Sequence, residues 1–258
     1  MLDSIKNQRV LVTAGGSGIG MSIAIEFHLK GARVHVCDIS EEAISNINKL
    51  YPEIGTSITD VGDAKQVASL YEDINSQYDG LDVLINNAGI GGPKVPLDEL
   101  SDADWDATIG VNLNGTFYCS KHASRIMKEQ KSGCIINIST ASVRTGLPLR
   151  APYVASKAGV QGLTYNIARE LGPYNIRCNA ILPGAIDNPR GHALVERRAK
   201  ELDITIEEAE NLRLQYISIR SRIDPREIAE SCLFLASDSG RHITGQMLGV
   251  CGNSEWEI

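Results

Sequence analysis

Aromatic residues are scarce in this chain: Phe, Trp and Tyr make up 5% of its 258 residues, whereas apolar residues as a whole make up 43%. The apolar residues are therefore mainly Val, Ile, Leu and Ala, which is typical of a parallel sheet covered on both faces. No apolar run approaches the roughly 20 residues that a membrane-spanning helix needs, and residues 1–10 lack the apolar stretch of a signal peptide. We therefore expect a cytoplasmic protein with no membrane partner.

An excess of positive charge is also missing. The formal net charge is −7, and the lysines and arginines are dispersed along the chain, so we expect no nucleic acid partner. The six cysteines show no CxxC spacing, and none of the five histidines lies at metal-ligand spacing from them, which predicts free thiols and no metal. Because no linker-like stretch divides the sequence, we expect residues 1–258 to form one domain.

Short β-branched runs alternate with longer helical patterns along most of the chain. This alternation indicates βαβ units and hence an α/β fold, with one doubly wound parallel β-sheet and helices on both of its faces. A ligand should then bind beyond the carboxyl ends of the strands. One charged segment with helical periodicity, residues 188–219, interrupts the alternation, and we interpret it as a substrate lid. The predicted strands are Arg9 to Thr13, Arg33 to Cys37, Ile54 to Ile58, Asp82 to Asn86, Cys134 to Ile138, Ile176 to Ile181 and 247–250, and the predicted helices cover 18–30, 41–50, 64–78, 102–130, 152–172 and 225–236.

A glycine-rich turn, TAGGSGIG at residues 13–20, follows the first predicted strand and opens a helix. Strand, turn and helix form the context of a dinucleotide-binding fingerprint, in which glycines let the backbone approach a pyrophosphate at the helix N-terminus. We therefore expect a Rossmann-type dinucleotide site; an ordinary tight turn is the alternative. The predicted cofactor contacts in the turn are Gly15, Ser17, Gly18 and Ile19.

Asp38 ends the second predicted strand, where a carboxylate can accept hydrogen bonds from the adenosine ribose hydroxyls. A 2′-phosphate at that place would meet like charge, and neither Ser17 nor Ile39 is a basic residue that would pair with it. The sequence therefore predicts NAD as the cofactor, with Asp38 and Ile39 beside the adenosine ribose. The alternative is that Asp38 only caps the helix that begins near Glu41.

Tyr153 and Lys157 lie four residues apart at the start of a predicted helix, which puts phenol and ammonium on one face. A free phenol has a pKa near 10 and is a poor base at neutral pH, but a neighbouring cation favours the phenolate. The pair can therefore exchange a proton with a substrate oxygen.

These motifs, together with residues 86–89 (NNAG), 111–113 (VNL) and Pro183-Gly184, resemble the short-chain dehydrogenase/reductase family in order and spacing along nearly the whole chain. The resemblance implies an NAD(H)-dependent oxidoreductase that interconverts a secondary alcohol and a ketone in a small-molecule substrate. It also implies a homotetramer built through the helices at 102–130 and 152–172.

The resemblance also assigns roles to individual residues. It implies that Tyr153 is the general acid/base, that Lys157 lowers the pKa of this tyrosine and holds the nicotinamide ribose, and that Asn112 supports a water relay. The further cofactor contacts that it implies are Asp60, Val61, Asn87, Ala88, Gly89, Pro183, Gly184 and Ile186, in addition to Tyr153 and Lys157.

The sequence departs from the family pattern at the catalytic hydroxyl. The family's serine falls on Thr140, with Ser139 and Ser142 as flanking alternatives; we expect Thr140 to act and Ser142 to face the substrate. Arg150 precedes Tyr153 by three residues and suggests a carboxylate on the substrate; the alternative is a solvated loop arginine. The substrate classes are therefore hydroxy acids, sugar-derived compounds and polyols.

Three other departures affect the glycine turn and the late strands. Ala14 replaces the first glycine of the turn, Asn188 replaces a threonine, and Cys251 replaces an aspartate. Two other functions remain open: an epimerase or dehydratase that retains its NAD, whose relatives are usually longer, and a non-catalytic NAD-binding protein.

Overall fold

The computed structural model describes residues 3–254, apart from the side chain of Arg190. In this part of the chain a seven-stranded sheet has the order β3-β2-β1-β4-β5-β6-β7, and every neighbouring pair is parallel. The predicted α/β fold with a doubly wound parallel sheet is confirmed. The strands are β1 Arg9–Thr13, β2 Arg33–Asp38, β3 Gly55–Ile58, β4 Val83–Asn86, β5 Gly133–Ile138, β6 Ile176–Pro183 and β7 Met247–Val250.

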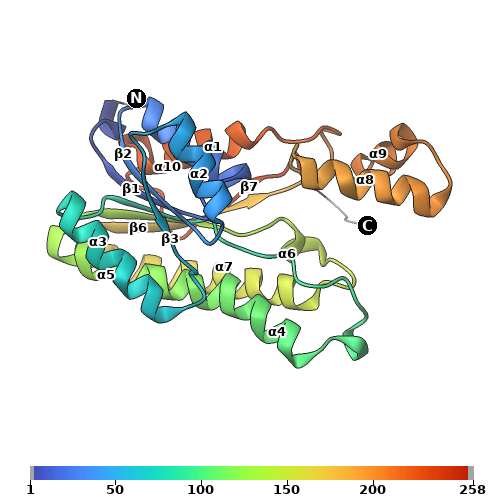
Figure 1. Ribbon diagram of the computed structural model, residues 1–258, viewed down its shortest axis with the longest axis horizontal. Coiled ribbons are helices and arrows are strands. Elements are labelled where there is room, and N and C mark those ends of the chain that lie inside the picture. The colour runs from blue at the N-terminus through green and yellow to red at the C-terminus, as the bar shows by residue number, and fades with distance from the viewer. Residues whose placement is uncertain (1–2, 255–258) are drawn as a thin grey trace.

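Helices cover both faces of the sheet (Figure 1). On one face lie α1 (Gly18–Leu29), α2 (Glu41–Leu50) and α10 (Pro225–Ala236), whose buried side chains form one hydrophobic core with the strands. On the other face α3 (Ala64–Tyr78), α5 (Gly115–Gln130) and α7 (Ala151–Leu171) form a second core. The strand segments are therefore buried on both sides, as their aliphatic sequences predict.

The helix predicted over residues 102–130 is present without a break, but it contains a π-helical insertion. It consists of α4 (Asp102–Ile109), a π-helical segment η3 (Gly110–Asn114) and α5. The insertion was not predicted because apolar periodicity does not reveal an added residue within a helix. Such π-helical turns occur frequently at functional sites. Asn112 lies inside the inserted segment.

The strand order reverses between β1 and β4. From β1 the chain proceeds through β2 to β3 in one direction, and from β4 it proceeds to β5 and β6 in the other. Ligands of doubly wound sheets bind at such a switch point, beyond the carboxyl ends of the strands. The ends of β1 and β4, at Thr13 and Asn86, therefore mark the place to look for the site.

Residues 188–219, predicted as helical, contain α8 (Pro189–Leu202) and α9 (Ile206–Leu214). The two helices pack chiefly on each other, through Val195, Ala199 and Ala209, and extend from one end of the sheet (Figure 1). A capping box between Thr205 and Glu208 starts α9. Within residues 3–254, every helix is too short or too polar to cross a membrane.

Candidate active site

The turn between β1 and α1 has one closed and one open face. A Cβ atom on Gly15 would lie 2.8 Å from the Val36 side chain, so the close approach to β2 requires glycine there. Gly18, with φ of 52°, has nothing within 4 Å of the position of a Cβ atom. This open face, with exposed Ser17 at the N-cap, lies where the first N–H groups of α1 have no helical acceptor. It suits a phosphate group.

Ala14 adopts the left-handed conformation, with φ of 48°. Most L-residues avoid this region because their Cβ atom crowds the carbonyl group. The turn therefore tolerates a methyl group at this position without moving its tightest corner, and Ala14 retains the conformation for which glycine is suited.

Asn87, directly after β4, fastens the glycine turn to the neighbouring strand. Its side-chain amide donates to the carbonyl oxygens of Thr13 and Ala14, each at 3.0 Å. In return the Thr13 hydroxyl accepts the N–H groups of Asn87 and Ala88, each also at 3.0 Å. These four bonds hold the carboxyl ends of β1 and β4 together at the switch point.

Asp38 is buried at the end of β2, with 8% of its surface exposed. One carboxylate oxygen accepts the Gly16 N–H at 3.1 Å, and the other accepts the Ser40 N–H at 3.0 Å. Within the described chain it forms no ion pair with a lysine or arginine. The neighbouring Ile39 side chain is 66% exposed, so this edge of the glycine turn is acidic and apolar rather than basic.

Asp60 and Val61 follow β3 at the same edge of the sheet. The Asp60 carboxylate accepts the Gly62 N–H at 2.8 Å and so shapes the loop. Val61 is buried against the start of α5, where a Cβ atom on Gly115 would lie 2.9 Å from its side chain. The loop backbone is thereby fixed between β3 and α5.

Asn112 joins three elements from inside the π-helical segment. Its amide oxygen accepts the Ile90 N–H at 2.8 Å, and its amide nitrogen donates to the Ile90 carbonyl at 3.0 Å. The same nitrogen donates to the Ser156 hydroxyl on α7 at 2.9 Å. Asn112 is fully buried, so these bonds satisfy a side chain that water does not reach.

Tyr153 and Lys157 lie on the first turns of α7, and Tyr153 is half-buried. The Lys157 ammonium is buried and donates to the Ile138 carbonyl at the end of β5, at 2.7 Å. Burial lowers the pKa of Lys157 to about 8 because the charged form is poorly solvated. A Cβ atom on Gly89 would lie 3.1 Å from this ammonium and 3.3 Å from the Asn112 amide oxygen, so both side chains meet at Gly89.

The three candidate hydroxyl groups after β5 have different partners. Ser139 donates to the Lys157 carbonyl at 3.1 Å and accepts from the Gln161 amide at 3.2 Å, so its hydroxyl is bound to α7. Thr140 and Ser142 share a hydrogen bond of 3.0 Å, and both are buried. Ser139 thus anchors the helix, while Thr140 and Ser142 act as a pair.

The segment after β6 carries Pro183, Gly184 and Ile186. A Cβ atom on Gly184 would lie 2.9 Å from Cys251, so cysteine packs where the family pattern has aspartate. Ile186 forms a parallel bridge with Ile223, in which Ile223 bonds to residues 185 and 187. The peptide groups of Ile186 itself therefore face away from Ile223.

Arg150 is the N-cap residue of α7 and reaches the loop after β4. Its Nη1 atom donates to the Gly91 carbonyl at 3.1 Å and to the Gly92 carbonyl. These two bonds orient the guanidinium group toward the loop after β4.

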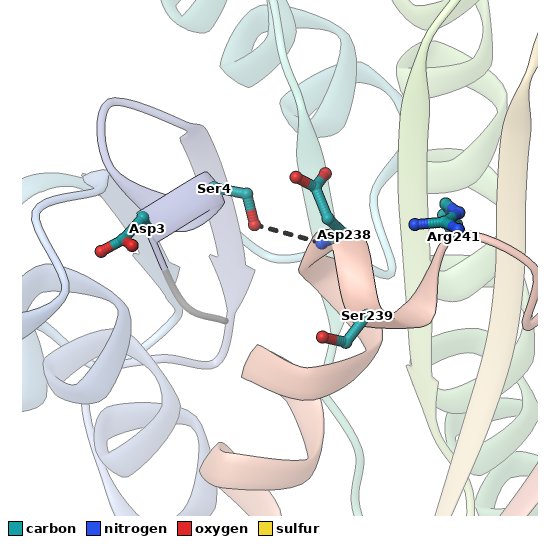
Figure 2. A pocket seen from close by; sticks show the side chains of 5 residues that line it. All are labelled: Asp3, Ser4, Asp238, Ser239 and Arg241. Carbon is teal, nitrogen blue, oxygen red and sulfur yellow. Dashed lines mark hydrogen bonds between the residues drawn. The ribbon is translucent and has the colours of Figure 1, made fainter.

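Among residues 3–254 no group of three or more His, Cys, Asp and Glu side chains could hold a metal ion, and all six cysteines are buried free thiols. A hollow of about 270 Å³ lies beside the turns that precede β1 and β7, at the opposite end of the sheet (Figure 2). Acidic, hydroxyl and basic residues line it, and all of them are exposed except the half-buried Ser4; they are Asp3, Ser4, Asp238, Ser239 and Arg241.

Two residues of the site were not predicted. Thr13 binds the N–H groups of residues 87 and 88, and Ser156 holds the Asn112 amide. Thr13 is the first residue of the 13–20 motif and Ser156 directly precedes Lys157, so position within or beside a motif was the available signal. Their partners lie 74 and 44 residues away, and one sequence does not reveal such pairings.

The sequence of this chain is similar to those of known reductases. A family model described as enoyl-(acyl carrier protein) reductase matches residues 13–252. The 3-oxoacyl-(acyl-carrier-protein) reductase FabG of Thermotoga maritima is 36% identical over 246 residues, covering 94% of this chain and 95% of that protein.

Two solved structures have the same fold over nearly their whole length. Actinorhodin polyketide ketoreductase with NADPH superimposes with a TM-score of 0.89 and 32% identity, covering 98% of this chain and 97% of that one. NAD+-bound xylitol dehydrogenase superimposes with a TM-score of 0.88 and 26% identity, covering 96% of this chain and 99% of that one. Since one structure contains NADPH and the other NAD+, overall similarity leaves the choice between the two nucleotides to the residues of the site.

Proposed function

Because the chain belongs to the short-chain dehydrogenase/reductase family of oxidoreductases, we propose that it interconverts a secondary alcohol and a ketone with NAD(H). Tyr153 is the general acid/base in this proposal. The observation that carries it is that the side chains of Lys157 and Asn112 meet at Gly89. Lys157 lies one helical turn after Tyr153 on α7. A buried lysine whose pKa is lowered to about 8 is costly to a fold, and such groups cluster at functional sites.

A nicotinamide dinucleotide fits the residues present. The open face at Gly18, beside the N-terminus of α1, leaves room for the pyrophosphate, while Gly15 is packed against β2. In our proposal Ser17 and Ile19 complete this contact, Asp60 and Val61 hold the adenine, and Asn87, Ala88 and Gly89 lie along the ribose.

The cofactor we propose is NAD, with Asp38 as the selecting residue. Its carboxylate is fixed by two N–H donors and no basic side chain pairs with it in the described chain, so a 2′-phosphate would meet uncompensated negative charge. Ile39, exposed beside it, offers apolar contact and no charge.

When bound, the nicotinamide supplies the carbon that accepts or gives the hydride. In oxidation the Tyr153 phenolate takes the hydroxyl proton of the alcohol, and in reduction the Tyr153 hydroxyl returns a proton to the substrate oxygen. The Lys157 ammonium stabilises the phenolate and holds the nicotinamide ribose. Thr140 donates a hydrogen bond to the substrate oxygen, and Asn112 fixes the loop at Ile90 and supports a water relay.

Pro183, Gly184 and Ile186 complete the nicotinamide end in this proposal. The peptide groups of Ile186 face away from the bridge with Ile223 and so can bind the carboxamide. Ser142, paired with Thr140, contacts the substrate, and residues 188–219 form a lid over it.

For the substrate we propose a small acidic or polyhydroxylated secondary alcohol. The support is Arg150, whose charged group is oriented by the Gly91 and Gly92 carbonyls three residues before Tyr153. A fixed guanidinium group suits a substrate carboxylate.

We also propose a cytoplasmic homotetramer. Six free thiols fit a reducing compartment. Phe117 on α5 and Tyr165 on α7 are 46% and 56% exposed, and large aromatic side chains of this kind are enriched at subunit interfaces.

The proposed function is tested by absorbance at 340 nm, with NAD+ and then NADP+, against hydroxy acids, sugar acids, polyols and cyclic alcohols. The variant Tyr153→Phe removes the proton-exchanging hydroxyl, and we expect its kcat to fall about a hundredfold or more. Tyr174→Phe, at an exposed tyrosine three residues after α7 ends, is the matched control and should retain wild-type activity.

Each result has a defined meaning. NADH formation that is lost in Tyr153→Phe supports the proposal, and faster turnover with NADP+ would contradict the role of Asp38. Conversion of substrate without net NADH formation would indicate an epimerase or dehydratase, whereas NAD+ binding without turnover would indicate a non-catalytic protein.

A further inference from the structure

Arg222, three residues before α10 begins at Pro225, forms an ion pair with the α8–α9 segment. Its Nε and Nη2 atoms bind the two carboxylate oxygens of Glu210 on α9, at 2.6 and 2.7 Å. The Arg222 side chain is 10% exposed and that of Glu210 is 24% exposed. Two parallel bonds of this kind fix the orientation of the Glu210 carboxylate relative to the guanidinium group as well as its distance, because the guanidinium group is planar.

The same guanidinium group also binds the backbone on both sides of residue 188. Its Nη1 atom donates to the Ile186 carbonyl at 3.3 Å, and Nη2 lies 3.5 Å from the Gly191 carbonyl. Arg222 therefore joins the segment after β6, the first turn of α8, and α9. Arg213, on α9, donates to the Gly191 carbonyl at 3.2 Å and reinforces this junction.

The junction is closely packed at Gly191. A Cβ atom on Gly191 would lie 2.6 Å from Arg222 Nη1 and 2.8 Å from the Ile186 carbonyl oxygen. The Asn188 side chain accepts the Gly191 N–H at 2.7 Å and caps α8. A shift of α8 would therefore be transmitted directly to Ile186.

Apolar packing does little to fix α8 and α9 against the sheet. Their buried residues form a small cluster of their own, separate from the two cores of the sheet. The polar contacts of Arg222 are therefore a main determinant of where the two helices lie relative to Ile186.

We propose that Arg222 is a positioning residue that couples the α8–α9 segment to the backbone of Ile186, and that Glu210 holds it in place. Arg222 touches the Ile186 carbonyl rather than substrate or cofactor. The inference rests on the proposed function, in which Ile186 binds the nicotinamide carboxamide. It assigns Arg222 to the nicotinamide end of the site and leaves the adenosine end unaffected.

The test compares two ligands that differ in the nicotinamide. NADH binding is measured by its fluorescence, and binding of ADP-ribose, which lacks nicotinamide, by calorimetry. We expect Arg222→Met to weaken NADH binding about tenfold and to leave ADP-ribose binding within about twofold of wild type. Glu210→Gln should act in the same direction, less strongly. Arg198→Met, which breaks the exposed pair with Glu201 on α8, is the matched control and should change neither affinity.

ADP-ribose binding also reports whether a variant is folded, and Arg222→Lys, which keeps the charge but cannot span all three partners, provides a milder change. If Arg222→Met and Arg222→Lys weaken the binding of NADH and of ADP-ribose equally, or weaken neither, the inference is overturned while the proposed function stands. If the wild type binds NADH no more tightly than ADP-ribose, both the inference and the proposed function are overturned.

Discussion

Replacing Lys157 by methionine removes a buried ammonium group, and we expect this to change how the free energy of unfolding depends on pH. Burial lowers the pKa of Lys157 from 10.5 to about 8. In the unfolded chain the ordinary value returns, so between these two pH values the unfolded state binds more protons than the folded state. The stability of the wild type therefore rises with pH across this window, and below pH 8 the full cost of the buried charge is present.

The size of the effect follows from the two pKa values. One pKa unit corresponds to about 1.4 kcal/mol, so the difference of about 2.5 units gives roughly 3 kcal/mol over the whole window. Most of this, about 2 to 3 kcal/mol, falls between pH 7 and pH 10. Lys157 is 4% exposed, so screening by solvent reduces the figure little.

The assay is urea unfolding of the nucleotide-free protein under reducing conditions at pH 7, 8, 9 and 10. Other titrating groups contribute to both curves, so the quantity of interest is the stability of the wild type minus that of Lys157→Met. We expect this difference to grow in favour of the wild type by about 2 to 3 kcal/mol from pH 7 to pH 10. A difference that stays constant with pH would refute the argument, because the ammonium would then have the same pKa in both states.

Three further changes test other parts of the site. Ala14→Gly should raise the free energy of unfolding by up to about 1 kcal/mol, because glycine adopts the left-handed conformation without strain; added backbone entropy in the unfolded chain offsets part of this gain. A lower free energy of unfolding in urea would contradict this prediction. Asn112→Ala leaves both peptide groups of Ile90 without their side-chain partner and should cost about 2 to 4 kcal/mol in the same assay, whereas a cost below about 1 kcal/mol would show that water replaces the amide. Arg150→Met should raise KM for hydroxy acids about tenfold and KM for neutral polyols less than twofold; equal increases would assign Arg150 to the loop alone.

The strands and the glycine turn could be predicted because their signals are local. Arg9–Thr13 is a β-branched run directly followed by glycines, and the predicted strand matches β1. Ala14 shows the limit of such reasoning, since its left-handed φ depends on how the turn packs against β2 and β4.

The site was harder to predict where distant residues determine the local backbone. The π-helical segment accompanies bonds from Asn112 to Ile90 and Ser156, which come from two other elements. In the same way, nothing near Arg222 in the sequence identifies Glu210 or Ile186 as its partners. The separation of Ser139 from Thr140 and Ser142 also required knowing that Ser139 binds the backbone of α7.

The small apolar cluster of Val195, Ala199 and Ala209 has an evolutionary consequence. Because α8 and α9 bury their apolar side chains mainly against each other, substitutions on their outer faces need not be matched by changes in the two cores of the sheet. Under selection for a new substrate these helices can therefore diverge rapidly while the strands and the glycine turn remain unchanged. Exchanging residues 192–209 between related enzymes should accordingly alter substrate preference with little loss of folding stability, provided that Gly191, Glu210 and Arg222 are retained.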